Sequence, residues 1–180
     1  MSDDWKLLNT STASGSSEIE FTSLTGYKIF KFVFVQVHGS ASGVDLRAEF
    51  SAGTGYADKA KTTTFFRAAH KEDGSATALS YQTGHDLAQS NSAKHISRDI
   101  GNDADHNISG ELLLFNPQST TYVKHFYGRS VAAHSTDIFI YDSFFAGYVN
   151  TDVTVDAVKF SFTSGNVDDG VFKQYGLVAS

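Results

Sequence analysis

The chain has 180 residues, about the length of one domain. Hydrophobic residues make up 41% and charged residues 19%, and the chain contains no Cys and one Pro. The absence of Cys excludes a disulfide scaffold, a zinc–thiolate site, an iron–sulfur cluster and a thiol nucleophile. A single Pro excludes collagen and Pro-rich disorder, and the abundance of Ser, Thr, Gly and Phe favours an all-β domain.

Acidic residues outnumber basic ones by 20 to 14, which gives a formal net charge of −6 at pH 7. Lys59 and Lys61 are the densest basic pair, so no cluster is available to neutralise nucleic-acid phosphates. Residues 1–5 lack the basic and apolar regions of a secretory signal. The longest apolar stretch, around residues 32–35, is far shorter than the roughly 20 residues of a membrane helix. We therefore expect no nucleic-acid partner, no membrane partner and synthesis in a cytoplasm.

Period-two alternation of apolar and polar residues dominates the chain and predicts strands with one buried and one solvated face. The exception is residues 29–37, an almost continuous apolar run that predicts a central strand covered on both faces. In chain order, the predicted strands are 5–9, 18–22, 29–37, 44–51, 62–69, 108–115, 121–130, 137–149, 158–163 and 171–177.

Turn-forming segments separate these strands, including a Ser-rich turn at 11–17, a turn at 164–166 and a predicted tight turn at 168–170. Strands at this spacing predict an all-β fold, a single jelly-roll-like antiparallel β-sandwich over residues 1–180. In this prediction residues 1–16 are an N-terminal segment and turn.

Residues 71–107 depart from the alternating pattern, because they are polar, rich in His and Asp, and only weakly periodic. Within them, residues 86–96 could form a short helix, with Asp86 as its N-cap. An excursion of this length is usually functional or packs over the sandwich. We refer to it as the polar excursion.

The polar excursion contains the candidates for a metal site: His85, His95 and His106, near Asp86, Asp99, Asp103 and Asp105. Two or three His with a carboxylate can bind zinc or iron. The spacing fits no known ligand pattern, and solvated loop residues explain it equally well. The chain also lacks a Gly-x-Ser-x-Gly elbow, a Walker motif and a Gly-x-Gly-x-x-Gly motif. The sequence therefore predicts no metal, no cofactor, no catalytic residue and no enzyme activity.

Aromatic residues gather in two consecutive predicted strands that a loop separates. Aromatics on both faces of neighbouring strands exceed what one core needs, and Tyr and Phe are enriched at protein interfaces. A thick sandwich core is the alternative explanation, and stacking against sugars is another. The predicted contact residues are Trp5, Tyr122, Tyr127, Tyr141, Phe144, Phe145 and Tyr148.

Several segments between Trp5 and Gly176 resemble a family of small virion structural proteins, head-decoration or fibre-like, of marine tailed bacteriophages. The resemblance implies a virion β-sandwich and offers no catalytic residue to carry over. It is carried by Trp5-Lys-Leu-Leu8, Ser17-Glu-Ile-Glu-Phe-Thr22, Tyr27-Lys-Ile-Phe-Lys-Phe-Val-Phe34, Thr62-Thr-Thr-Phe65, Ser109-Gly-Glu-Leu-Leu-Leu-Phe-Asn-Pro117, Thr120-Thr-Tyr-Val-Lys-His125, Gly147-Tyr-Val-Asn150, Val155-Asp-Ala-Val-Lys-Phe160 and Val171-Phe-Lys-Gln-Tyr-Gly176.

From this resemblance we expect a capsid decoration, or cement, protein in the virion. It would bind the outside of the head shell non-covalently, with the major capsid protein or other virion proteins as partners. Repeated symmetric contacts make weak binding sites effective by multivalency. A homo-oligomer is expected, with a trimer as one option. The alternatives are a tail-fibre or receptor-binding component that recognises host glycan, a carbohydrate-binding module of a host and, last, a hydrolase.

Overall fold

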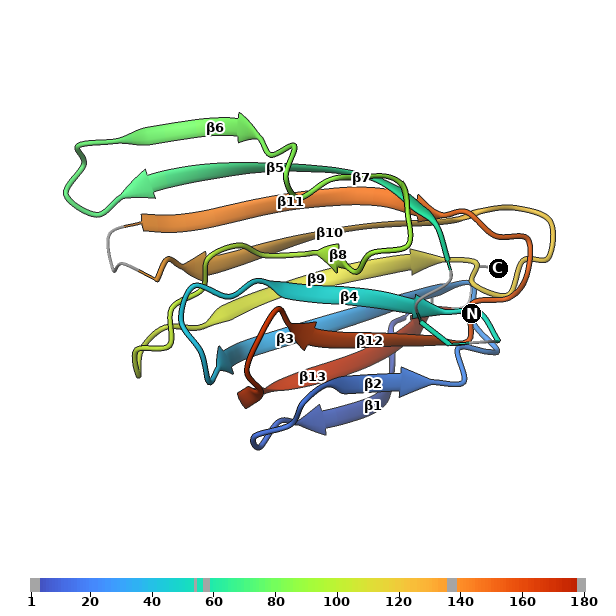
Figure 1. Cartoon of the computed structure of the whole chain (residues 1–180). Coiled ribbons are helices and arrows are strands. Elements are labelled where there is room, and N and C mark those ends of the chain that lie inside the picture. Colours follow the sequence, from blue (N-terminus) through green and yellow to red (C-terminus); the bar gives the residue numbers. More distant parts are fainter. Residues whose placement is uncertain (1–3, 54, 57–58, 136–138, 178–180) are drawn as a thin grey trace.

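The computed structural model describes residues 4–53, 55–56, 59–135 and 139–177, which form two antiparallel β-sheets packed face to face (Figure 1). The prediction of an all-β antiparallel sandwich is therefore confirmed, while jelly-roll connectivity stays a prediction. Within the described ranges, no helix is long and apolar enough to cross a membrane.

The larger sheet has nine strands and the smaller sheet has four. In the larger sheet the order is β1 (Lys6–Thr12), β13 (Val167–Leu177), β3 (Ile29–Gly39), β9 (Ile108–Phe115), β10 (Lys124–Ala133), β11 (Phe139–Val149), β5 (Lys61–Lys71) and β6 (Thr77–Tyr81), and β7 (Leu87–Ser90) also pairs with β5. In the smaller sheet the order is β2 (Ile19–Thr22), β12 (Ala157–Phe162), β4 (Leu46–Ser51) and β8 (Lys94–His95).

Aromatic rings fill the space between the two sheets. Phe160 of β12 is fully buried, and the centroid of its ring lies 5.3 Å from that of Phe172, 5.8 Å from Phe32, 6.3 Å from Phe34 and 6.4 Å from Phe21. These rings come from both sheets, so one shared core holds the sandwich together.

The strand over residues 29–37 differs from its prediction. In β3, Phe30, Phe32 and Phe34 are fully buried, whereas Val35 is 40% exposed. The prediction that both faces of this strand are covered is wrong, because the smaller sheet packs against only one side of the larger sheet. The apolar residues on the other side of β3 remain accessible.

The polar excursion adds strands at the edges of both sheets. β6 returns along β5 as a hairpin, and β8 then adds an edge strand to the smaller sheet. The predicted helix over residues 86–96 is wrong, since β7 and β8 are extended in this segment. The amide of Leu87 donates to Thr63 Oγ1 (2.9 Å), and the amide of Ile96 donates to the Leu46 carbonyl (2.9 Å). Hydrogen bonds to neighbouring strands thus replace those of a helix, for which Ser and Asn at 90–92 have low propensity.

Several strand boundaries also differ from the predictions. The predicted tight turn at 168–170 is wrong, because these residues lie inside β13, at irregular pairings with β3. A Cβ at Gly170 would lie 2.6 Å from the Val37 Cα, so the close approach of the two strands requires glycine here. β1 continues to Thr12, into the predicted Ser-rich turn, and β10 begins at Lys124 instead of residue 121. Residue 137, the predicted start of the next strand, lies outside the described residues.

Candidate functional site

The side of the larger sheet that points away from the smaller sheet is rich in exposed apolar side chains. We call it the open face. Among the described residues, ten large hydrophobic side chains are exposed, and eight of them project from the open face. These eight are Leu7, Val35, Phe66, Leu79, Tyr81, Tyr127, Val131 and Ile140.

Side-chain pairs hold the aromatic rings of the open face in place. Phe66 and Phe144 are opposite each other on β5 and β11, and their rings stack at 4.9 Å with an interplanar angle of 6°. The Arg129 guanidinium lies 4.9 Å from the Phe144 ring and donates two hydrogen bonds to Asp142, at 2.7 and 2.6 Å. Rings fixed in this way lose little side-chain entropy when a partner covers them.

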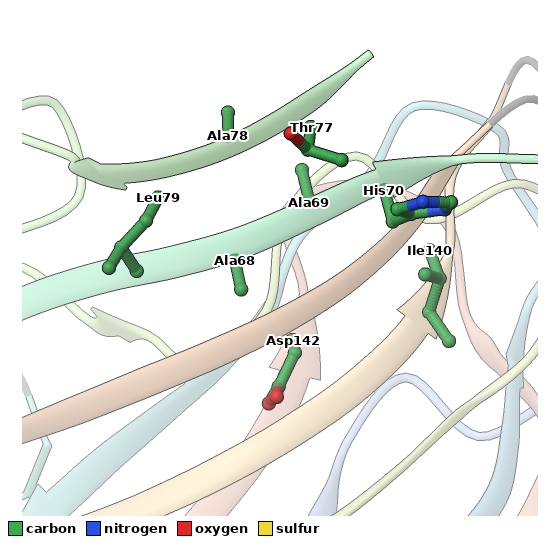
Figure 2. Close-up of a pocket in the computed structure, with 8 residues that line it drawn as sticks. All are labelled: Ala68, Ala69, His70, Thr77, Ala78, Leu79, Ile140 and Asp142. Atoms are coloured by element: carbon green, nitrogen blue, oxygen red, sulfur yellow. The ribbon is translucent and has the colours of Figure 1, made fainter. Parts of the chain in front are cut away.

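The open face carries several shallow hollows, of which two bear on binding. One, of about 480 Å³, lies between β6, β5 and β11, where Leu79 and Ile140 stand near the short side chain of Ala68 (Figure 2). The other, of about 430 Å³, lies over Ala146 and Gly147 and is lined by Tyr127 and Tyr148 among others. Small residues at the floor of each hollow leave room for side chains of a partner.

The predicted contact residues divide between the surface and the core. Tyr127, Phe144 and Tyr148 lie on the open face, and the Trp5 ring lies beside it, 4.4 Å from Lys31 Nζ. Tyr122 is 71% exposed, but it lies on the loop between β9 and β10.

Tyr141 and Phe145 are buried, so the prediction that they form surface contacts is wrong. In β11 the side chains alternate, and these two residues point into the sandwich while Phe144 points out. Phe66 was not among the predicted contact residues; its neighbour Phe65 is buried, whereas Phe66 itself is exposed. The only signal was alternation along the strand. Phe66 comes two residues before the half-buried Ala68, so both side chains lie on the same side of β5.

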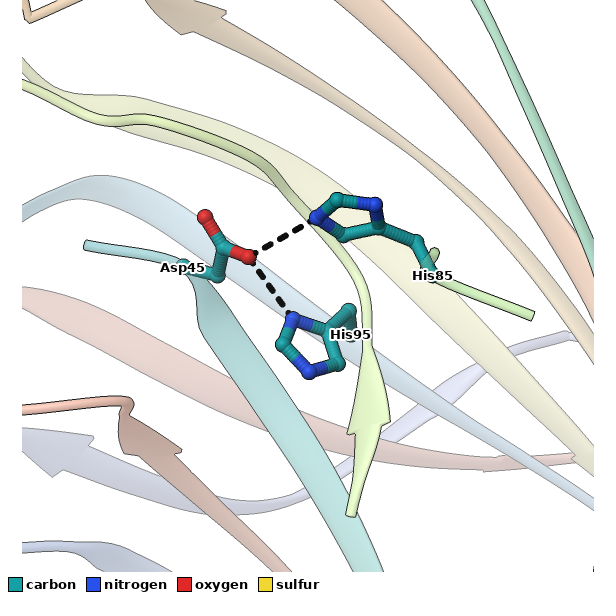
Figure 3. Close-up of side chains that lie close together, drawn as sticks. All are labelled: Asp45, His85 and His95. Atoms are coloured by element: carbon teal, nitrogen blue, oxygen red, sulfur yellow. Dashed lines mark hydrogen bonds and ion pairs between the residues drawn. The ribbon is translucent and has the colours of Figure 1, made fainter. Parts of the chain in front are cut away.

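A cluster of titratable side chains lies where the polar excursion meets the smaller sheet (Figure 3). Asp45 directly precedes β4, His85 follows the turn after β6, and His95 is on β8. Asp45 Oδ2 lies 3.0 Å from His85 Nε2 and 2.7 Å from His95 Nδ1. Because β8 pairs with β4, His95 is held beside the chain that carries Asp45.

Hydrogen bonds hold both the side chain and the backbone of Asp45 in place. Its second carboxylate oxygen, Oδ1, accepts a hydrogen bond from the Asp99 amide (2.7 Å), and its own amide donates to Thr163 Oγ1 (3.1 Å). Burial alone would raise the pKa of Asp45, but hydrogen bonds from His85 and His95 and the Asp99 amide outweigh it and hold that pKa well below its usual range. Since an ionised carboxylate only accepts, both histidine nitrogens that face it carry a proton.

Lys94 supports the cluster from the core side. Its side chain is fully buried, its Nζ donates to the His85 carbonyl (2.6 Å) and lies 4.9 Å from the centroid of the Phe65 ring. Burial lowers the pKa of Lys94 to about 7, and the nearby charge of Asp86 offsets this only in part. The Phe65 ring also packs against the His85 ring at 5.4 Å.

The structure brings together only part of the predicted histidine and aspartate set. His85 and His95 meet at Asp45, a residue that the sequence analysis did not connect to them. His106 lies outside this cluster, and its amide donates a hydrogen bond to the Asp103 carbonyl (2.8 Å). The remaining carboxylates have other roles: Asp86 accepts from the Tyr81 hydroxyl, Asp99 pairs with Arg98, and Asp105 lines a groove with His106.

Comparison with known proteins gives little guidance. No protein-family model matches the chain, and no curated protein matches it. A solved structure of infectious bursal disease virus, Gx strain, aligns over 99% of this chain and 42% of the viral chain, at 9% sequence identity and a TM-score of 0.16. The chain thus spans less than half of that viral protein, and a TM-score this low does not indicate a shared fold.

Proposed function

We propose that the chain is a virion structural protein that attaches through its open face to the outside of a phage head shell. The observation that carries this proposal is that, in the part of the chain that the structure describes, eight of the ten exposed large hydrophobic side chains gather on one face. Monomers rarely leave such an apolar surface free unless a partner covers it. The proposed partner is a regular protein shell.

The charges of the molecule suit this role. The net charge of −6 opposes adhesion to packaged nucleic acid and keeps the free chain soluble before assembly. On the open face itself, Arg129 is neutralised by Asp142, so covering this pair leaves no unpaired charge. A shell presents the same binding site many times, so modest affinity for each copy is sufficient.

Replacing both Tyr127 and Phe144 by Ser is expected to weaken binding to the shell at least about thirtyfold, because central aromatic residues dominate interface energies. Both side chains project to solvent, so the change leaves the core intact. The measurement is co-sedimentation of the purified chain with head shells that were assembled without it. Circular dichroism reports whether the variant keeps its fold.

The matched control is Tyr122→Ser, which removes a more exposed tyrosine from a loop off the open face. This variant is expected to bind within about twofold of the unaltered chain. Equal binding by the double variant and the unaltered chain would refute the proposal, as would an equal loss in the control.

The hollow beside Tyr127 and Tyr148 favours a second candidate function, recognition of a host glycan by a tail component. Tyrosine rings around an apolar hollow of about 430 Å³ could stack against a sugar ring. In that case the isolated chain would bind host polysaccharide, Tyr148→Ala would abolish the binding, and shells would not compete for it. Binding to shells without polysaccharide binding favours the decoration role.

A further inference from the structure

We propose that Asp45, His85 and His95 bind one divalent transition-metal ion, with zinc as the best-fitting ion. The proposal rests on the position of three ligand atoms, one carboxylate oxygen and two imidazole nitrogens, which all lie within 4.8 Å of one another. Figure 3 shows both rings turned toward the same oxygen of Asp45. This site is separate from the open face and from the proposed role in the virion.

The spacing of the ligand atoms is close to that of a metal site. Two ligands at about 2.0–2.1 Å from a tetrahedral ion lie roughly 3.3 Å apart. The His85 and His95 nitrogens lie 3.0 and 2.7 Å from Asp45 Oδ2, and all three atoms lie within 4.8 Å of one another, so rotations of these side chains would bring them to the distances that an ion requires. The ion replaces the two protons that now point at the carboxylate. Each neutral imidazole then carries its proton on its other ring nitrogen.

The chemistry of the donors selects the class of ion. Two imidazoles and one carboxylate suit zinc and its borderline neighbours, whereas calcium and magnesium prefer sites made of oxygen alone. Three protein ligands leave at least one coordination position for water or another ligand. The side chains of His85, His95 and Asp45 are 16%, 26% and 12% exposed, so an ion can reach them from solvent.

Neighbouring groups orient the ligands, as outer residues do in metal sites. The Asp99 amide holds the oxygen of Asp45 that does not face the histidines, which leaves Oδ2 for the ion. The Phe65 ring and the hydrogen bond from Lys94 to the His85 carbonyl fix the position of His85. None of these contacts has to break when an ion binds.

A bound ion would fasten the polar excursion to the smaller sheet. The three ligands come from the start of β4, the turn after β6, and β8, which are 40 and 50 residues apart along the chain from Asp45. An ion that binds only the folded chain stabilises it. At a hundredfold excess over Kd, zinc is expected to raise the Tm by about 5–10 °C.

The test is a titration of the chelator-treated full chain with zinc by calorimetry, and with cobalt(II) by visible absorption. We expect one ion for each chain and a cobalt spectrum typical of a site with nitrogen and oxygen ligands. His85→Gln and His95→Gln should each weaken zinc binding at least about a hundredfold and remove the rise in Tm. His70→Gln, a change to an exposed histidine on β5, should leave both unchanged.

Asp45→Asn provides a second test, because it keeps the shape of the side chain while it removes the charge. Circular dichroism separates loss of binding from loss of fold in each variant. The proposal is overturned if the unaltered chain binds no zinc stoichiometrically, if both histidine variants bind as tightly as the unaltered chain, or if His70→Gln weakens binding as much as they do. None of these outcomes depends on attachment to a shell, so the metal site and the proposed function are tested independently.

Discussion

Phe160→Ala is expected to lower the free energy of unfolding by about 3–5 kcal/mol, the range for removing a large aromatic side chain from a core. Phe160 is fully buried, and its ring lies within 6.4 Å of four other rings from both sheets. Alanine would leave a cavity in the middle of the interface between the sheets. Urea denaturation at neutral pH measures the effect.

Phe66→Ala is the matched control, because it removes the same atoms from the open face. Phe66 is 41% exposed and loses mainly its stack with Phe144, which is worth about 0.5–1.5 kcal/mol beyond the area it buries. We expect this variant to lose clearly less stability than Phe160→Ala. Equal losses would mean that the open face is packed like a core, or that the two sheets do not meet at Phe160.

Stability is expected to rise by about 3 kcal/mol from about pH 7 to about pH 9.5 because of Lys94. Burial lowers the pKa of this residue from 10.5 to about 7 in the folded chain. Between these two values the unfolded chain binds the extra proton, so raising the pH favours the folded state. Above pH 10 the trend should reverse because of Tyr56. Burial and the hydrogen bond to Glu20 raise the pKa of Tyr56, so the folded chain keeps the tyrosine proton at a pH where the unfolded chain loses it.

Urea midpoints across this pH range, with a chelator present, provide the measurement. Lys94→Met should lose most of the rise, and the buried Lys124, whose pKa is also lowered by burial, should account for a smaller remaining slope. Lys6→Met changes an exposed lysine and should keep the full slope. A flat profile for the unaltered chain would show that Lys94 stays charged in the fold, or that its surroundings open to water.

Local alternation was sufficient to predict the class of fold and most of the strands. The strand predicted over residues 44–51 forms as β4 from Leu46 to Ser51, and Leu46, Ala48 and Phe50 are buried as predicted while Arg47 and Glu49 are not. Asp45 and Ser51, predicted on the solvated face, are buried. Alternation does not say how many sheets cover a strand. For this reason the apolar run at 29–37 could not be recognised as a strand with one open side.

The sequence also did not show which side of the strand each aromatic residue faces. Phe144 and Phe145 are adjacent, and both faces of β11 carry aromatic residues, so periodicity alone could not assign one to the core. The register of β11 with β10 and β5 shows which residue faces outward, because it sets Phe144 opposite Phe66. The same ambiguity led to the wrong assignment of Tyr141.

The cluster of Asp45, His85 and His95 could be recognised only in part from the sequence, because its members are distant along the chain. His85 and His95 stood out by composition, whereas Asp45 read as one of several polar residues in an alternating strand. Its role depends on the pairing of β4 with β8, which places Arg47 opposite His95. That pairing arises from tertiary packing, which also overrides the weak helical pattern at 86–96.

The proposal that the chain attaches to a phage head shell is tested most directly by quantitative mass spectrometry of virus particles purified from cells that produce the chain. A protein that covers a head shell through its open face should be present in hundreds of copies for each particle. A chain that is missing from the particles, or present in about a dozen copies or fewer, as the symmetry of a tail would require, contradicts attachment to the shell.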